Sequence, residues 1–140
     1  MAGPSAGDRM KVYLAIAAGT ALGGTTRYLV ALAFVQGLGL AHPLATAFVN
    51  VTGSFLIGLF ATLTDPDGRL FVGGTARQAV MTGFLGGYTT FSLLSLETLE
   101  LVEAGTPTAA TLYVLGSLAA SLVAVWLGHI LAVRINRLPR

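Results

Sequence analysis

The chain has 140 residues, of which 54% are hydrophobic and 10% are charged, with a net charge of only +2 and no cysteine. A soluble domain usually carries about a quarter charged residues, so this chain has too few to cover a surface that faces water. The lack of cysteine excludes a disulfide framework and a thiolate metal site, and the small net charge argues against a nucleic-acid partner. With a mean hydropathy of +0.78, the composition predicts a single-domain integral membrane protein over residues 1–140.

Four apolar segments follow one another along the chain, at about 12–34, 44–63, 78–102 and 109–133. Each is close to the ~20 residues that a helix needs to cross a bilayer. The segments between them are rich in glycine, proline, aspartate or threonine, as connecting loops should be. We therefore expect an all-α, multi-pass membrane protein whose four transmembrane helices form one bundle.

Positive charge is concentrated on one side of this expected bundle. The other two connecting loops contain no lysine or arginine. The positive-inside rule then places both termini in the cytoplasm, with the protein in the inner or plasma membrane. The residues that share the basic side are Arg9, Lys11, Arg69, Arg77, Arg134, Arg137 and Arg140.

Two of the expected spans carry uncharged polar residues that repeat along one face of a helix. A polar group inside the bilayer is costly, so such residues face either the bundle interior or a wet path. Taken singly, each hydroxyl is explained as well by helix–helix packing as by a pathway. An amide such as Asn50 needs several partners and favours the pathway. The two stripes are Thr46, Asn50 and Gly53 in the second span, and Tyr113, Ser117 and Ser121 in the fourth.

The third span contains the sequence GFLGGYTTFS at residues 83–92, in which three glycines weaken a helix. If the helix breaks near Gly86–Gly87, the carbonyls of Gly86 through Thr89 lose their partners and need water, protein or an ion. Uncharged oxygen ligands suit a monovalent cation. The hydroxyls of Thr89, Thr90 and Ser92, with the positive ring edge of Phe91, suit an anion instead.

Two charged residues lie close to these polar segments. Arg27 is deep in the first span, where it either snorkels to the far interface or draws anions into a vestibule. Glu97 follows the glycine-rich segment in the third span, where it is placed to cap or orient that segment.

At these residues the chain resembles the Fluc (CrcB) family of fluoride channels. The matching motifs are GGTTRY at 23–28, NVTGSFLIG at 50–58 and GFLGGYTTFS at 83–92, followed by Glu97, and the match runs from Lys11 to about Arg134. The resemblance implies a four-helix subunit that pairs antiparallel with a second copy, as a dual-topology dimer. It also implies passive export of fluoride, which lowers the cytoplasmic fluoride concentration and gives fluoride resistance.

The resemblance further implies roles for particular residues. The carbonyl oxygens of Gly86 and Thr89 from both subunits would bind a structural sodium ion, Na+, at the dimer interface. Phe91 would be the first pore phenylalanine, Asn50 the amide beside it, and Arg27 the vestibule arginine. The remaining pore lining would come from Thr46, Ser92, Tyr113, Ser117 and Ser121, with Glu97 as an orienting carboxylate.

The chain departs from the family pattern in two respects. Leu93 and Leu94 stand where the family usually has a threonine and a second phenylalanine, so a fluoride site there would lose a hydroxyl and a positive ring edge. The one-sided charge also fits poorly with a dual-topology homodimer, which needs nearly balanced loops. A homodimer is our first expectation, and a heterodimer with an oppositely oriented paralogue is the alternative.

Other functions make different demands on the sequence. A four-helix dual-topology exporter of small cations or drugs needs a titratable carboxylate in its cavity, but the first two spans contain no aspartate or glutamate. An intramembrane hydrolase built on Ser54 needs a histidine base within reach, and His129 lies near a span end. We therefore expect no enzyme. A weakly conducting or structural subunit stays open if Leu94 impairs conduction.

Overall fold

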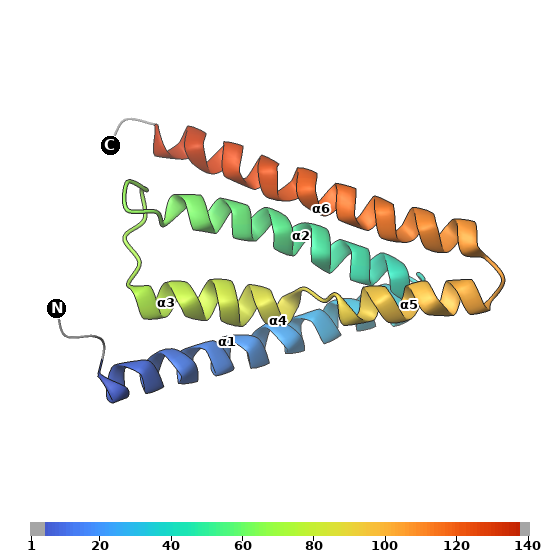
Figure 1. Cartoon of the computed structure of the whole chain (residues 1–140), viewed down its shortest axis with the longest axis horizontal. Helices are drawn as coiled ribbons and strands as arrows, with labels where there is room; N and C mark the ends of the chain where they lie inside the picture. The colour runs from blue at the N-terminus through green and yellow to red at the C-terminus, as the bar shows by residue number, and fades with distance from the viewer. Residues whose placement is uncertain (1–4, 138–140) are drawn as a thin grey trace.

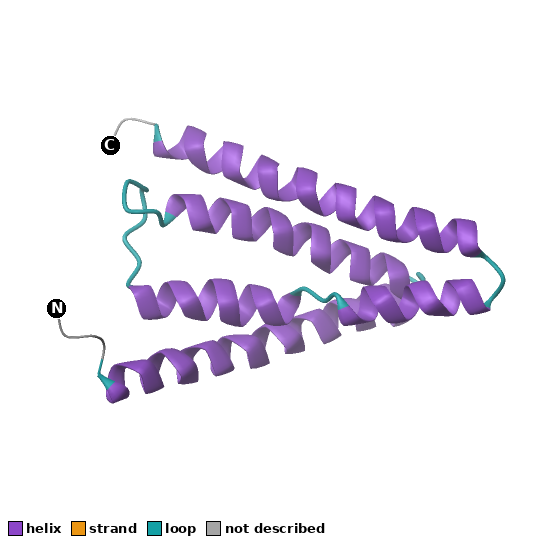
Figure 2. Cartoon of the chain, viewed as in Figure 1, coloured by secondary structure: helices purple, strands orange, loops and turns teal. Residues whose placement is uncertain are grey.

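The computed structural model describes residues 5–137, which form helices and short connections and contain no strand (Figures 1 and 2). The predicted all-α fold class is confirmed. The elements are α1 Ala6–Leu32, the π-helical turn η1 Ala33–Gly37, α2 His42–Leu63, α3 Gly74–Gln78, the π-helical segment η2 Ala79–Leu85, α4 Gly86–Tyr88, α5 Ser92–Glu103 and α6 Pro107–Asn136.

Proline and glycine set the boundaries of the long helices. Pro43 and Pro107 lie in the first turn of α2 and α6, where a missing N–H costs no helical hydrogen bond. Gly39 and Gly105 precede these helices with φ of 66° and 76°, a conformation that side chains disfavour. The observed bounds of α2 and α6 therefore lie within a few residues of the predicted spans 44–63 and 109–133.

Three helical stretches are long and apolar enough to cross a membrane: His42–Leu63, Gly74–Glu103 and Pro107–Asn136. They correspond to the second, third and fourth predicted spans, and the chain is a multi-pass membrane protein. Helix α1 has 27 residues, but its glycines, threonines and Arg27 keep it outside this set. The first predicted span, 12–34, therefore stays a prediction.

Helices α2 and α6 run side by side in the same direction (Figure 1). Near one end the Thr62 hydroxyl lies 2.8 Å from His129 Nδ1. One turn earlier the backbones touch, because a Cβ at Gly58 would lie 2.2 Å from the Val125 carbonyl oxygen. Both contacts join residues 67 positions apart. The two helices thus keep one register over at least this turn.

Glycines also hold α1 against the third span. A Cβ at Gly23 would lie 2.0 Å from the Phe84 carbonyl oxygen, and one at Gly19 would lie 2.3 Å from the Ala79 carbonyl oxygen. From the other side, a Cβ at Gly87 would lie 2.5 Å from the Thr20 carbonyl oxygen. Small residues four apart let two backbones approach closely in this way, as they do in transmembrane helix pairs.

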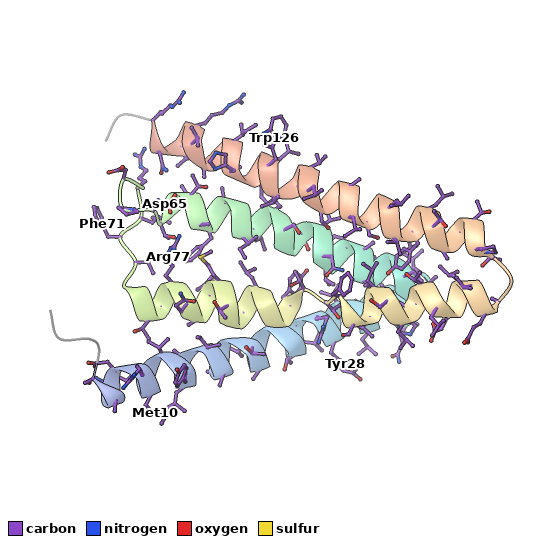
Figure 3. The ribbon with its side chains drawn as sticks, viewed as in Figure 1. Met10, Tyr28, Asp65, Phe71, Arg77 and Trp126 are labelled. Atoms are coloured by element: carbon purple, nitrogen blue, oxygen red, sulfur yellow. The ribbon has the colours of Figure 1, made fainter. Side chains whose placement is uncertain are left out.

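Both described ends of the chain and the loop between α2 and α3 gather at one end of the bundle (Figure 1). Arg77 donates to the Thr64 hydroxyl at 3.0 Å and to the Asp65 carboxylate at 3.2 Å, and Figure 3 shows Arg77 and Asp65 at this end. Asn136 fixes the same loop by accepting from the Arg69 N–H at 3.0 Å. The basic residues among 5–137, other than Arg27, lie in these segments.

Candidate functional site

The third span is non-helical for three residues between α4 and α5 (Figure 2). Helix α4 ends at Tyr88, Thr89 is extended with φ −80° and ψ 161°, and α5 begins at Ser92. Gly86 and Gly87 remain helical. The interruption therefore begins three residues beyond the first of the two glycines that the sequence suggested as the weak point.

Asn50 on α2 pairs with the interrupted backbone through both ends of its amide. Its Nδ2 donates to the Thr90 carbonyl oxygen at 2.8 Å, and its Oδ1 accepts from the Thr90 N–H at 2.7 Å. In a continuous helix the Thr90 N–H would donate to the Gly86 carbonyl. Asn50 therefore replaces the helical partner of Thr90 and leaves the Gly86 carbonyl without that donor.

A cavity of about 390 Å³ lies beside the interruption, between α2, the third span and α6. We call it the central cavity. No charged side chain lines it among the described residues, and the hydroxyls of two α6 serines face it together with the Asn50 amide. Of the predicted site residues, the central cavity brings together Asn50, Gly86, Thr89, Phe91, Ser117 and Ser121.

Phe91 and Leu94 lie on the wall of the central cavity in different surroundings. The Phe91 ring is 73% exposed in the single chain, whereas Leu94 is 3% exposed. Leu93 is exposed at 37%. The Ser92 hydroxyl lies 3.2 Å from that of Thr90 and outside the cavity lining. The residue that replaces the second phenylalanine is thus an aliphatic part of the wall.

Three further predicted residues form a separate buried cluster. The Glu97 carboxylate, 6% exposed, accepts from the Thr46 hydroxyl at 2.8 Å through Oε1 and from the Tyr113 hydroxyl through Oε2. The cluster joins α2, α5 and α6 and is not part of the central cavity lining. Glu97 therefore orients the two hydroxyls and is itself held by them.

Arg27 reaches the interruption from α1. Its Nη1 donates to the Thr89 carbonyl oxygen at 3.4 Å, and the side chain is half-buried. Within one chain, a cationic group therefore already lies at one of the two carbonyls expected to bind sodium.

Sequence reasoning missed Ser54 as a lining residue. It lies on α2 one turn beyond Asn50 and faces the central cavity. The signal was present, since Ser54 continues the stripe of Thr46 and Asn50 at a spacing of four. His129 bonds to Thr62, two turns further along α2, so it offers Ser54 no base.

These features define the class of protein: a multi-pass helical membrane protein with an uncharged, hydroxyl-lined cavity beside an interrupted span. The family model described as CrcB-like protein, Camphor Resistance (CrcB), matches residues 14–129. The chain belongs to the CrcB family.

Relatives match over nearly the full chain. A protein named fluoride-specific ion channel FluC 1 from Rhodopseudomonas palustris (strain BisB18) is 54% identical over 131 residues, which cover 94% of this chain and 93% of the relative. Another of that name from Bradyrhizobium diazoefficiens is 52% identical over 140 residues, with 98% and 97% covered. Fluoride-specific ion channel FluC from Opitutus terrae is 54% identical over 129 residues, with 92% and 98% covered.

Proposed function

We propose that this chain is a subunit of a fluoride-selective channel, through which fluoride leaves the cell passively. The observation that carries the proposal is the central cavity, whose polar lining consists of hydroxyls, an amide and backbone groups, without a carboxylate among the described residues. Such a lining offers hydrogen-bond donors to an anion and no negative charge to repel it. The relatives above are named as channels, not enzymes, which agrees with this lining.

Fluoride is small and strongly hydrated, so the protein must replace the hydrogen bonds that the ion loses with water. Ser117 and Ser121 can supply O–H donors from α6, and Phe91 can turn the positive edge of its ring toward the ion. Leu94 can supply neither. We therefore expect weaker binding at this point of the wall than an aromatic ring would give.

We expect passive transport in a direct test. Purified protein in fluoride-loaded liposomes should release fluoride when the electrical potential is clamped, with no proton or sodium gradient across the membrane. A proton-coupled exporter would instead need a carboxylate in its cavity, but no carboxylate lines the central cavity among the described residues. Efflux that requires either gradient would rule out the channel and favour the exporter.

We further propose that the working unit is an antiparallel dimer and that the break in the third span at residues 89–91 is needed for its function. Phe91 and Gly86 are exposed on the wall of the central cavity, and a second subunit laid against them would complete that wall. The basic residues at one end of the bundle favour one orientation for this chain. A heterodimer with an oppositely oriented paralogue would complete the cavity wall and also agree with the one-sided charge. A homodimer requires that the same chain inserts in both orientations.

Sodium at the dimer interface is a separate proposal. The Gly86 carbonyl has lost its Thr90 donor to Asn50, so it is suited to a monovalent cation. The Thr89 carbonyl fits less simply, because the Arg27 guanidinium lies 3.4 Å from it within one chain. One chain offers two such carbonyls, so a partner must add ligands. Bound sodium would hold the two interrupted spans together.

Removing the Thr89 hydroxyl should leave sodium binding intact, because the expected ligand is the main-chain carbonyl. The hydroxyl itself donates to the Leu85 carbonyl oxygen at 2.9 Å. We expect Thr89→Val dimers to keep the parental response when sodium is replaced by a large organic cation at constant ionic strength. The measurement is dimer dissociation in detergent. If dissociation of the parental dimer does not depend on sodium, the proposed site is wrong. If only a stable Thr89→Val dimer loses the dependence on sodium, the ligand is the Thr89 side chain and not its carbonyl.

A further inference from the structure

Three serines within the long helices have hydroxyls that make no hydrogen bond inside the described residues 5–137: Ser54, Ser117 and Ser121. Several threonine hydroxyls in these helices bond back to a carbonyl one turn earlier, and those of Thr46 and Thr62 bond to a side chain of another helix. The Thr52 hydroxyl, for example, donates to the Phe48 carbonyl oxygen at 2.7 Å. That local bond is the usual way to satisfy a hydroxyl inside a membrane. The three serines without it all line the central cavity.

The register of α2 and α6 places Ser54 opposite Ser121. Thr62 and His129 are in hydrogen-bond contact, and Gly58 meets the Val125 backbone, so at these two levels an α2 residue contacts the α6 residue 67 positions later. The same offset pairs Ser54 with Ser121, and both belong to the cavity lining. It equally pairs Asn50 with Ser117. The Ser54–Ser121 level thus lies one turn, about 6 Å, further along α2 than Asn50.

We propose that Ser54 and Ser121 together form a fluoride-binding position, one turn beyond the Asn50 level. This inference rests on the proposed channel function and adds Ser54 to the residues that contact the ion. Two O–H donors from facing helices can replace two of the hydrogen bonds that fluoride loses with water. One turn further along α2 there is no side-chain donor, because Gly58 packs against the Val125 backbone there. The Ser54 level is therefore the last polar position of the cavity in this direction.

Simple helix packing would give Ser54 a different environment. A serine that joins helices bonds to a backbone carbonyl or to a facing side chain, and among the described residues Ser54 does neither. Its hydroxyl faces the central cavity instead. Removing it should therefore cost little stability and much transport.

The test is fluoride efflux from liposomes at matched protein density, measured over a range of fluoride concentrations. We expect Ser54→Ala to lower the rate below saturation about tenfold, equivalent to about 1.4 kcal/mol of lost ion stabilisation. Ser54→Cys keeps the approximate side-chain size, but its thiol is a weak hydrogen-bond donor, so its rate should fall between those of the parent and Ser54→Ala. Thr111→Val is the matched control, because the Thr111 hydroxyl bonds back to the Pro107 carbonyl oxygen at 2.9 Å on an exposed part of α6. Its rate should stay parental.

The double variant Ser54→Ala with Ser121→Ala tests whether the two hydroxyls bind the same ion. Shared binding predicts a combined loss that differs from the product of the single losses. Parental transport in Ser54→Ala of undiminished thermal stability would overturn the inference, as would independent effects of the two serines. If Ser54→Ala does not fold, parental transport in Ser54→Cys of undiminished thermal stability would overturn the inference instead. A parent that carries no fluoride would overturn the proposed channel function itself, which separates the two failures.

Discussion

Asn50→Leu should lower fluoride flux at least about a hundredfold and destabilise the protein. The leucine removes both hydrogen bonds to Thr90, which measure 2.8 and 2.7 Å, and leaves a peptide N–H and C=O unpaired at membrane depth. Each buried group without a partner costs about 1–3 kcal/mol. We expect the interrupted segment to rearrange, and with it the position of Phe91 on the cavity wall.

Asn136 provides a matched control for this result, because its amide also clamps a backbone. It accepts from the Arg69 N–H and donates from Nδ2 to the Thr62 carbonyl oxygen, both at 3.0 Å. Asn136 lies at the end of α6, where water can replace these bonds. Asn136→Leu should therefore lower thermal stability modestly and leave the flux per folded protein unchanged. Equal flux losses in the two variants would mean that Asn50 acts only through stability.

The Asn50→Asp variant separates charge from shape. An ionised carboxylate can still accept from the Thr90 N–H but cannot donate to the Thr90 carbonyl, and it places negative charge beside the cavity. At 4 Å, the repulsion between two unit charges is about 4 kcal/mol for an effective dielectric constant of 20. The variant should conduct poorly at neutral pH and partly recover as the introduced carboxyl is protonated, after subtraction of leakage from protein-free liposomes. A pH-independent loss would assign the effect to shape.

Much of the site could be predicted from the sequence because its residues repeat within single helices. The spacing of four in Tyr113, Ser117 and Ser121 fixes one face of α6 before any fold is known. Which helices those faces meet depends on tertiary register, which the spacing does not contain. Thr46 and Tyr113, which the resemblance assigns to the pore lining, both bond to Glu97 in a buried cluster outside the central cavity, and their place in the pore stays a prediction.

The glycines of the third span were the harder case. A glycine weakens an isolated helix, so Gly83, Gly86 and Gly87 suggested a break by propensity alone. In the structure Gly83 and Gly87 stay helical and face α1, where Gly19 and Gly23 repeat the same spacing of four. Propensity describes a single helix, and here close packing between two helices outweighs it. The equal spacing of four in Gly19 and Gly23 and in Gly83 and Gly87 was the signal in the sequence for this close helix packing.

Gly23→Ala should separate α1 from the third span and destabilise the protein by more than the 1–3 kcal/mol typical of overpacking. The added Cβ would lie 2.0 Å from the Phe84 carbonyl oxygen and 2.8 Å from the Tyr88 nitrogen. Both are backbone atoms, so no side chain can turn aside to make room. Because Arg27 lies one turn further along α1, the displacement would also withdraw its guanidinium from the Thr89 carbonyl. We expect loss of flux together with loss of stability.

Gly24→Ala is the control that isolates this contact, since it changes the adjacent residue of the same helix in the same way. Its Cβ would lie 4.0 Å from the Gly87 carbonyl oxygen, an ordinary contact distance. Alanine favours a helix over glycine by about 1 kcal/mol, so Gly24→Ala should be as stable as the parent or more stable. Thermal unfolding in detergent and flux in liposomes measure both variants. A Gly23→Ala protein as stable as Gly24→Ala would show that α1 does not approach the third span as closely as the glycine contacts require.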